Sequence, residues 1–266
     1  MSKYLLSSDE EMGRLQLQAR VWEAEAVNML DCIGVQPGWS CVDLGCGAMG
    51  ILGSLSRRVG SEGRVIGVDR ETPLIEAAQR YIQEESLRNV ELIDADVHHS
   101  GLPAGTFDLV HERFVLPYVD VETVIGEMVS LTRPGGIVAV QEPDHYSWNY
   151  FPESPRWPRF REILEATFRL KGDINVGRQT FTVLRSTGLE DVTVRAAVIA
   201  LQDSHPYMRL PIIALGALRP TILEAGLATE AELEDCVADL EARVSDPGTF
   251  AVMFTTTQVW GRKPLA

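Results

Sequence analysis

The feature that most constrains the fold is a short apolar run, residues 39–45 (WSCVDLG), which leads into a glycine-rich turn. A run of this kind is typical of a parallel strand buried on both faces of a sheet. Gly45, Gly47 and Gly50 have the spacing GxGxxG, and Asp69 ends the next predicted strand. Glycines let a backbone approach a ligand closely, and an acid at that strand end can accept hydrogen bonds from ribose hydroxyls. We therefore expect a nucleoside-containing cofactor at this turn.

Strands and helices alternate after the turn. Further strands are predicted at 64–69, 90–96, 107–113 and 136–144, with one helix beginning at Thr72-Pro73 and another capped by Asp120. Alternation of this kind requires a parallel sheet with helices on both faces. Residues 9–34 lack proline and have apolar residues at helical spacing. We expect residues 1–38 to form an N-terminal helical lid and residues 39–144 a Rossmann-like, cofactor-binding core.

The remainder of the chain, residues 145–266, is predicted to form the substrate side. It opens with an aromatic passage, 145–160, and contains two long β-branched strands, 192–201 and 249–261, that should pair as the sheet edge. Two helical patterns lie between these strands, at about 206–226 and 229–245. An insertion of this length is too long for a hairpin turn, so we expect a helical cap at about 203–248, before the last strand.

Composition excludes several classes of partner. The 24 Lys and Arg against 38 Asp and Glu give a formal charge of −14, which disfavours a nucleic acid because phosphates require a basic surface. The four cysteines have no metal-binding spacing, so no metal site is expected. The longest apolar stretch, 211–218, is too short to span a bilayer, and no signal peptide is apparent. We expect a cytoplasmic protein without membrane or nucleic-acid partners, as a monomer or homodimer.

The glycine spacing alone does not separate NAD(P) from S-adenosylmethionine (SAM). Asp43, two residues before the first glycine, suits a cationic sulfonium and amino group and would repel a pyrophosphate. A helical extension precedes the first strand, whereas simple dinucleotide folds open with that strand. Asp96 follows the third strand at a position suited to the adenine amine, and TRPGGIV places a turn before the fifth strand. Together these features favour SAM.

At this point the sequence resembles the class I SAM-dependent methyltransferases, in the small-molecule branch related to the ubiquinone and menaquinone C-methyltransferases. The similar segments are VDLGCGAMG, GVDR, DADV, FDLVHERFVLPYV and LTRPGGIVAVQEPD, within residues 4–144. The resemblance implies an α/β fold with a doubly wound, mostly parallel, seven-stranded sheet, preceded by N-terminal helices and carrying the helical cap. It also implies SAM as cofactor and S-adenosylhomocysteine (SAH) as product.

The same resemblance assigns cofactor contacts to particular residues. Gly45, Cys46 and Gly47 would lie against the methionine and ribose, with Asp43 near the cationic groups. Asp69 would bind the ribose, Arg70 would flank the adenine, and Asp96 with Val97 would hold its edge. Glu112, through its carbonyl, and Arg113 would meet the methionine amino and carboxylate groups. Tyr4 is the candidate closing aromatic, and Arg14 or Gln18 would reach the methionine end unless this face of the helix is simply exposed.

The substrate side is less defined. His145 is our candidate catalytic base because a neutral imidazole accepts a proton near pH 7; its alternative is a packing or capping role. His111, Tyr146, Trp148 and Asn175 are candidate substrate contacts, since aromatic walls suit a planar or apolar acceptor. His111 and Arg113 could equally fix the turn that follows their strand.

These observations predict a SAM-dependent methyltransferase of specialised metabolism, acting on O, N or C of a small organic molecule, for which an aromatic compound is one candidate. Methyl transfer needs alignment of a nucleophile, and a base is optional because the sulfonium is already activated. The alternatives are a SAM-binding enzyme of the same fold that does not transfer methyl, such as a cyclase, and, more remotely, an NAD(P) oxidoreductase.

Overall fold

The computed structural model describes residues 9–170 and 172–265. Its main sheet has seven strands in the order β3-β2-β1-β4-β5-β10-β7. Their bounds are β1 Ser40–Leu44, β2 Arg64–Asp69, β3 Val90–Asp94, β4 Phe107–Arg113, β5 Thr132–Asp144, β7 Glu190–Ala197 and β10 Thr255–Arg262. Only β10 runs antiparallel to its neighbours, β5 and β7. The predicted doubly wound, mostly parallel, seven-stranded sheet is confirmed.

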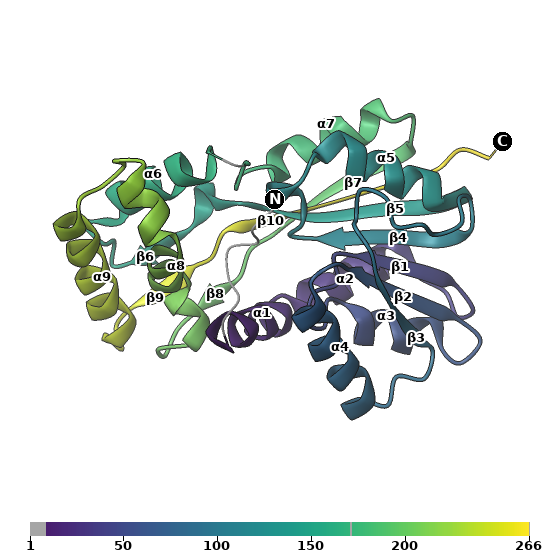
Figure 1. Ribbon diagram of the computed structural model, residues 1–266, viewed down its shortest axis with the longest axis horizontal. Coiled ribbons are helices and arrows are strands. Elements are labelled where there is room, and N and C mark those ends of the chain that lie inside the picture. Colours follow the sequence, from purple (N-terminus) through teal and green to yellow (C-terminus); the bar gives the residue numbers. More distant parts are fainter. Residues whose placement is uncertain (1–8, 171, 266) are drawn as a thin grey trace.

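Helices cover both faces of this sheet (Figure 1). One face carries α5 (Val121–Leu131) and α7 (Gly177–Ser186); the other carries α2 (Glu23–Ile33), α3 (Leu52–Val59) and α4 (Thr72–Glu84). Side chains alternate along each strand between the two cores, so Val42 packs with α5 while the preceding Cys41 packs with α2 and α3. Helix α5 begins at the predicted cap, where Asp120 Oδ1 accepts from the Thr123 amide at 2.9 Å.

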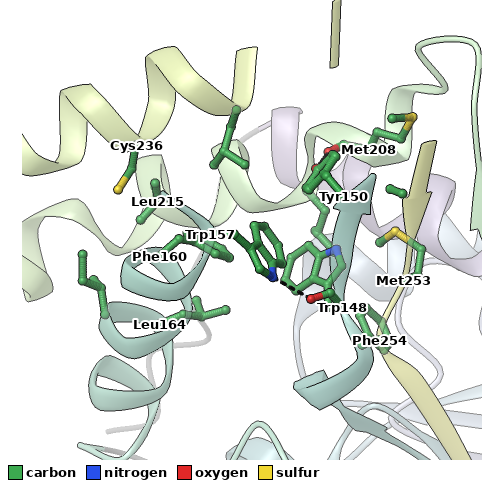
Figure 2. Close-up of a cluster of buried hydrophobic side chains, with 14 of the residues drawn as sticks. Trp148, Tyr150, Trp157, Phe160, Leu164, Met208, Leu215, Cys236, Met253 and Phe254 are labelled. Atoms are coloured by element: carbon green, nitrogen blue, oxygen red, sulfur yellow. Dashed lines mark hydrogen bonds between the residues drawn. The ribbon is translucent and has the colours of Figure 1, made fainter. Parts of the chain in front are cut away.

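A second lobe, at the left of Figure 1, is built mainly from the second half of the chain. It contains a three-stranded sheet in the order β6-β9-β8 and three helices. Their bounds are β6 Asn149–Phe151, β8 Ala200–Leu201, β9 Phe250–Val252, α6 Trp157–Phe168, α8 Leu210–Glu224 and α9 Glu230–Ser245, with short helices η2 His145–Ser147 and η3 Pro206–Arg209. The core of the lobe is aromatic, and Trp148, Trp157 and Phe160 lie at its centre (Figure 2).

The two long strands predicted at 192–201 and 249–261 are each divided in the structure. The first becomes β7 and β8, and the second becomes β9 and β10, so that one part of each lies in the main sheet and the other in the small one. The break occurs where the Met253 amide donates to the Ile199 carbonyl at 2.9 Å, and the next residue, Phe254, turns its ring into the aromatic core. Of β7 and β10, only β7 lies at an edge of the main sheet, because β10 lies between β5 and β7.

Helix α1 (Asp9–Val21) precedes α2 and contacts η3 of the second lobe. It therefore lies between the sheet and that lobe, as Figure 1 shows. None of the helices in the described ranges is long and apolar enough to cross a membrane.

Candidate active site

The turn after β1 is closed by contacts that only glycine permits. The Gly45 and Cys46 amides both donate to the Val68 carbonyl, at 2.7 and 3.0 Å, which ties the turn to β2. Gly50 has φ +45°, and a Cβ there would lie 2.2 Å from Asp43 Oδ2. That same oxygen accepts from the Ile51 amide at 3.1 Å, just before α3 begins. The turn and the acid at the end of β1 thus form one rigid unit.

Asp69, at the end of β2, faces this turn. Its carboxylate accepts from the Gly47 amide at 2.8 Å and from the Glu71 amide at 3.1 Å. Burial raises the pKa of Asp69, and these backbone hydrogen bonds partly offset that rise because they favour the charged form. The position, at the carboxyl end of a parallel strand, suits the ribose contact that the sequence predicted.

A cleft of about 930 Å³, including its open mouth, lies along the turn. Nine of the predicted cofactor residues line it: Gln18, Asp43, Gly45, Cys46, Gly47, Asp69, Arg70, Val97 and Arg113. Asp96 does not line the cleft; its carboxylate accepts from Arg70 Nη1 at 2.8 Å and from the His98 amide at 2.9 Å, and this last bond is the main cause that lowers its pKa to about 2. Asp96 therefore acts on the cleft through Arg70. Tyr4 lies outside the described residues.

Arg113 brings a buried cation to the wall of the cleft. Its Nη2 donates to the Gly50 carbonyl at 3.1 Å, and its Nη1 is buried with no partner among the described residues. Burial lowers the pKa of the guanidinium, and the Asp43 carboxylate is the leading cause that opposes this. An unpaired buried donor of this kind is costly, so the site suits an incoming carboxylate. This geometry fits the amino-acid end of SAM.

The Glu112 side chain does not line the cleft and belongs to a buried pair of carboxyls. It is fully buried and pairs with Glu142 of β5, which accepts from the Val115 and Leu116 amides at 2.9 Å each. Burial, and then the neighbouring carboxyl, raise the pKa of Glu112 well above its usual range; burial raises that of Glu142 to about 7. Burial and the neighbouring carboxyl therefore disfavour ionising both groups together. The pair anchors the turn that carries Phe114.

We expect Glu112→Gln to flatten the pH dependence of stability. The pKa of Glu142 is higher in the folded chain than its ordinary 4.5, so folding binds protons; stability is therefore full below about pH 4.5 and is lost as pH rises towards about 7. Glu112 contributes to the same loss because its own pKa is raised, and a glutamine cannot ionise, so the variant loses the Glu112 part of this pH dependence. Urea unfolding at several pH values measures the effect; the exposed Glu122→Gln is the control. An unchanged slope between pH 4.5 and 7 would contradict a raised pKa for Glu112.

A second cavity, of about 860 Å³, opens beside the cofactor cleft. The two share three wall residues, Gln18, Phe114 and Tyr118. The other wall residues are mostly apolar and come from α6, α8 and the aromatic core: Arg14, Pro117, Pro143, His145, Trp148, Leu164, Phe168, Leu210, Ile213, Ala214, Ala217, Leu218 and Phe254. Phe114, Phe254 and the part of the wall formed by α8 were not predicted from the sequence. Phe114 directly follows the predicted fourth strand, and this position was the available signal.

His145 lines the second cavity, but its environment argues against the predicted base. Its Nδ1 donates to the Ile174 carbonyl at 2.8 Å, and its ring packs on Phe254 at 4.7 Å between centroids. Burial lowers its pKa to about 4, so the imidazole is neutral at pH 7 and its conjugate acid is too strong for efficient proton removal. With Nδ1 donating, Nε2 is left as a hydrogen-bond acceptor.

Three of the four predicted substrate residues do not line the cavity. His111 belongs to β4 and is fully buried within the fold, where it hydrogen-bonds to Asp43 and Gln141. Tyr146 is 68% exposed, with Arg161 and Arg178 stacked on its ring, because η2 turns it outward. Asn175 accepts from the His145 amide at 2.8 Å and so supports that residue. Trp148 does line the cavity.

Comparison with known proteins agrees with this geometry. Residues 36–184, more than half of the chain, match the family model described as a methyltransferase domain. The demethylmenaquinone methyltransferase of Geobacillus stearothermophilus is 31% identical over 198 residues, covering 69% of this chain and 83% of that protein. An uncharacterised 37.1 kDa protein in transposon TN4556 of Streptomyces fradiae is 38% identical over 117 residues, covering 44% of this chain and 33% of that protein.

Among solved structures, the geranyl diphosphate C-methyltransferase of Streptomyces coelicolor A3(2), in complex with Mg²⁺, geranyl-S-thiolodiphosphate and SAH, superposes with a TM-score of 0.56. The identity is 17%, over 92% of this chain and 77% of that one, so this likeness concerns the fold. The chain spans 33% to 58% of the length of most of the curated relatives that it matches.

The chain therefore belongs to the methyltransferase-domain family. Its domain is that of the class I SAM-dependent methyltransferases related to the quinone methyltransferases, as the sequence motifs predicted.

Proposed function

We propose that this protein transfers the methyl group of SAM to O, N or C of a small organic acceptor with an apolar body. The observation that carries the proposal is the shared wall: the cofactor cleft and the second cavity meet at Gln18, Phe114 and Tyr118. A ligand in one cavity would lie against a ligand in the other. Methyl transfer requires such a meeting of two bound molecules, with the nucleophile in line with the methyl.

The proposed cofactor contacts follow from the cleft. Asp69 would accept hydrogen bonds from the ribose hydroxyls, Arg113 Nη1 would bind the methionine carboxylate, and Asp43 would face the amino group. SAM supplies an electrophilic methyl when bound, so the protein's own task is alignment and exclusion of water. Helix α1 serves that task as a lid, since Leu15, Gln18 and Ala19 close one side of the cleft.

The acceptor is proposed to bind among the apolar walls of the second cavity, within the segment 145–266. A drug-sized ligand fits a volume of this order, and apolar walls favour an apolar or aromatic body. His145 would offer its Nε2 as an acceptor to a donor group on the substrate, and would orient that group without removing its proton. A relative is named for demethylmenaquinone, which supports an acceptor with a large apolar part.

Incubation with methyl-labelled SAM and a fractionated metabolite extract tests the proposal. We expect SAH and a labelled small molecule to form. Ala214→Trp should fill the second cavity and abolish methyl transfer while SAM binding stays unchanged, because Ala214 lines the second cavity and does not line the cofactor cleft. The matched control is Gly216→Ala, which lies on the same helix. A Cβ at Gly216 would meet no atom within 4 Å, so this variant should behave as the parent. SAM binding with persistent failure to form SAH would favour an enzyme that does not transfer methyl.

A further inference from the structure

A row of buried polar side chains crosses one face of the main sheet beneath α2. It begins at Asp43 of β1 and continues through His111 of β4, Gln141 of β5 and Gln258 of β10 to Arg195 of β7. Successive members are joined by hydrogen bonds of 2.7, 2.8, 2.8 and 2.6 Å. Asp43, His111, Gln141 and Gln258 are all buried. We call these five residues the relay.

The direction of every hydrogen bond in the relay is determined by its far end. Arg195 only donates, so the atom of Gln258 facing it is the oxygen, and the Gln258 amide nitrogen then donates to the Glu25 carbonyl at 2.9 Å. That nitrogen also donates to Gln141 Oε1, which leaves the Gln141 amide nitrogen to face His111 Nε2. His111 Nε2 must therefore accept, and its single proton sits on Nδ1.

This arrangement keeps His111 neutral. A second proton on its ring would place an N–H directly against the amide hydrogens of Gln141, at a buried position where such a clash is weakly screened. The Asp43–His111 contact is therefore a carboxylate hydrogen-bonded to a neutral imidazole. The negative charge of Asp43 is left uncompensated by its nearest partner.

At the cofactor end, Asp43 and Arg113 present opposite charges to the same part of the cleft. This pair is complementary to an amino-acid zwitterion, whose carboxylate would meet Arg113 and whose ammonium would meet Asp43. A charged His111 would leave the site with a net positive charge and would remove that complementarity.

We propose that His111, Gln141 and Gln258 are positioning residues that keep Asp43 charged and aimed at the zwitterionic methionine end of the cofactor. The relay fixes the tautomer of His111 from the far edge of the sheet, where Arg195 is held by Glu25 of α2 at 2.6 Å. This inference rests on the proposed function, because it assumes that SAM occupies the cleft.

Gln141→Glu tests the relay. The new carboxylate would accept from Nε2, so His111 would take up a second proton and pair with Asp43 as a cation, with the added negative charge on the far side of the ring. We expect the affinity for SAM and SAH at pH 7 to fall about tenfold or more. Affinity for 5′-methylthioadenosine, which lacks the amino-acid end, should stay within about twofold. Gln141→Met, which removes the donor without adding charge, is the matched variant and should lose less affinity.

Nitrogen-15 NMR of the His111 ring in the parent protein gives an independent measurement that needs no variant. We expect a protonated Nδ1 and a bare Nε2, and two protonated nitrogens in Gln141→Glu. A parent ring protonated at Nε2 would overturn the inference. Equal losses for SAM and 5′-methylthioadenosine, or unchanged SAM affinity in Gln141→Glu, would do so too. Failure of the parent to bind SAM or SAH would instead refute the proposed function.

Discussion

Gly50→Ala is expected to abolish useful cofactor binding. The added Cβ would lie 2.2 Å from Asp43 Oδ2 and 2.8 Å from the Cys46 carbonyl, and the backbone at this position is left-handed at φ +45°. Either Asp43 must leave its bonds to the Ile51 amide and His111, or the turn must open and carry the Gly50 carbonyl away from Arg113. Each response disturbs the cofactor end of the cleft.

We expect SAH affinity, measured by calorimetry, to fall about 100-fold or more, and the free energy of unfolding to fall by about 1–3 kcal/mol from backbone strain. Gly60→Ala is the matched control, because Gly60 is also left-handed, at φ +66°, but a Cβ there meets nothing within 4 Å. It should lose some stability and keep SAH affinity. Wild-type affinity in Gly50→Ala would show that the turn adapts.

Trp157→Ala should cause the largest loss of stability. Trp157 is buried at the centre of the second lobe, with its ring 4.8 Å from Phe160 and 5.3 Å from Trp148 between centroids (Figure 2). Its Nε1 donates to the Trp148 carbonyl at 2.7 Å. Truncation would leave a large cavity and an unpaired buried carbonyl, which together cost about 3–5 kcal/mol.

Urea unfolding measures this loss, and Trp157→Phe is the control that keeps most of the packing but removes the hydrogen bond. It should lose a smaller part of the stability. SAH affinity should change little in either variant under folding conditions, since Trp157 does not line the cofactor cleft. A loss below about 1 kcal/mol for Trp157→Ala would mean that the lobe repacks around the gap.

The cofactor half of the site could be predicted from sequence because its signals are local. Glycine spacing and acids at strand ends depend on a few consecutive residues, and the alternation of strands and helices brings those ends together at one edge. Asp43 and Asp69 could therefore be expected beside this cleft, whereas Arg113 required the family resemblance. Gln18 required the family resemblance, since a helix face alone does not show what it covers.

The acceptor half could not be predicted in the same way. Its walls come from α1, the turn at Phe114, α6, α8 and the break at Phe254, which are far apart in the sequence and meet only through the second lobe. Local patterns also do not show which way an aromatic points: Tyr146 faces solvent, while Trp148, two residues later, is buried. The lowered pKa of His145 could not be predicted either, because the sequence does not give its burial.

Helix α1 bears on the order in which ligands bind. Gln18 belongs to the walls of both cavities, and its side-chain oxygen accepts from Arg14 of the same helix and from Tyr207 of the second lobe. Part of the surface that an acceptor meets is therefore completed by whatever occupies the neighbouring cleft. We therefore expect an ordered addition, with the methyl donor bound first and the acceptor second.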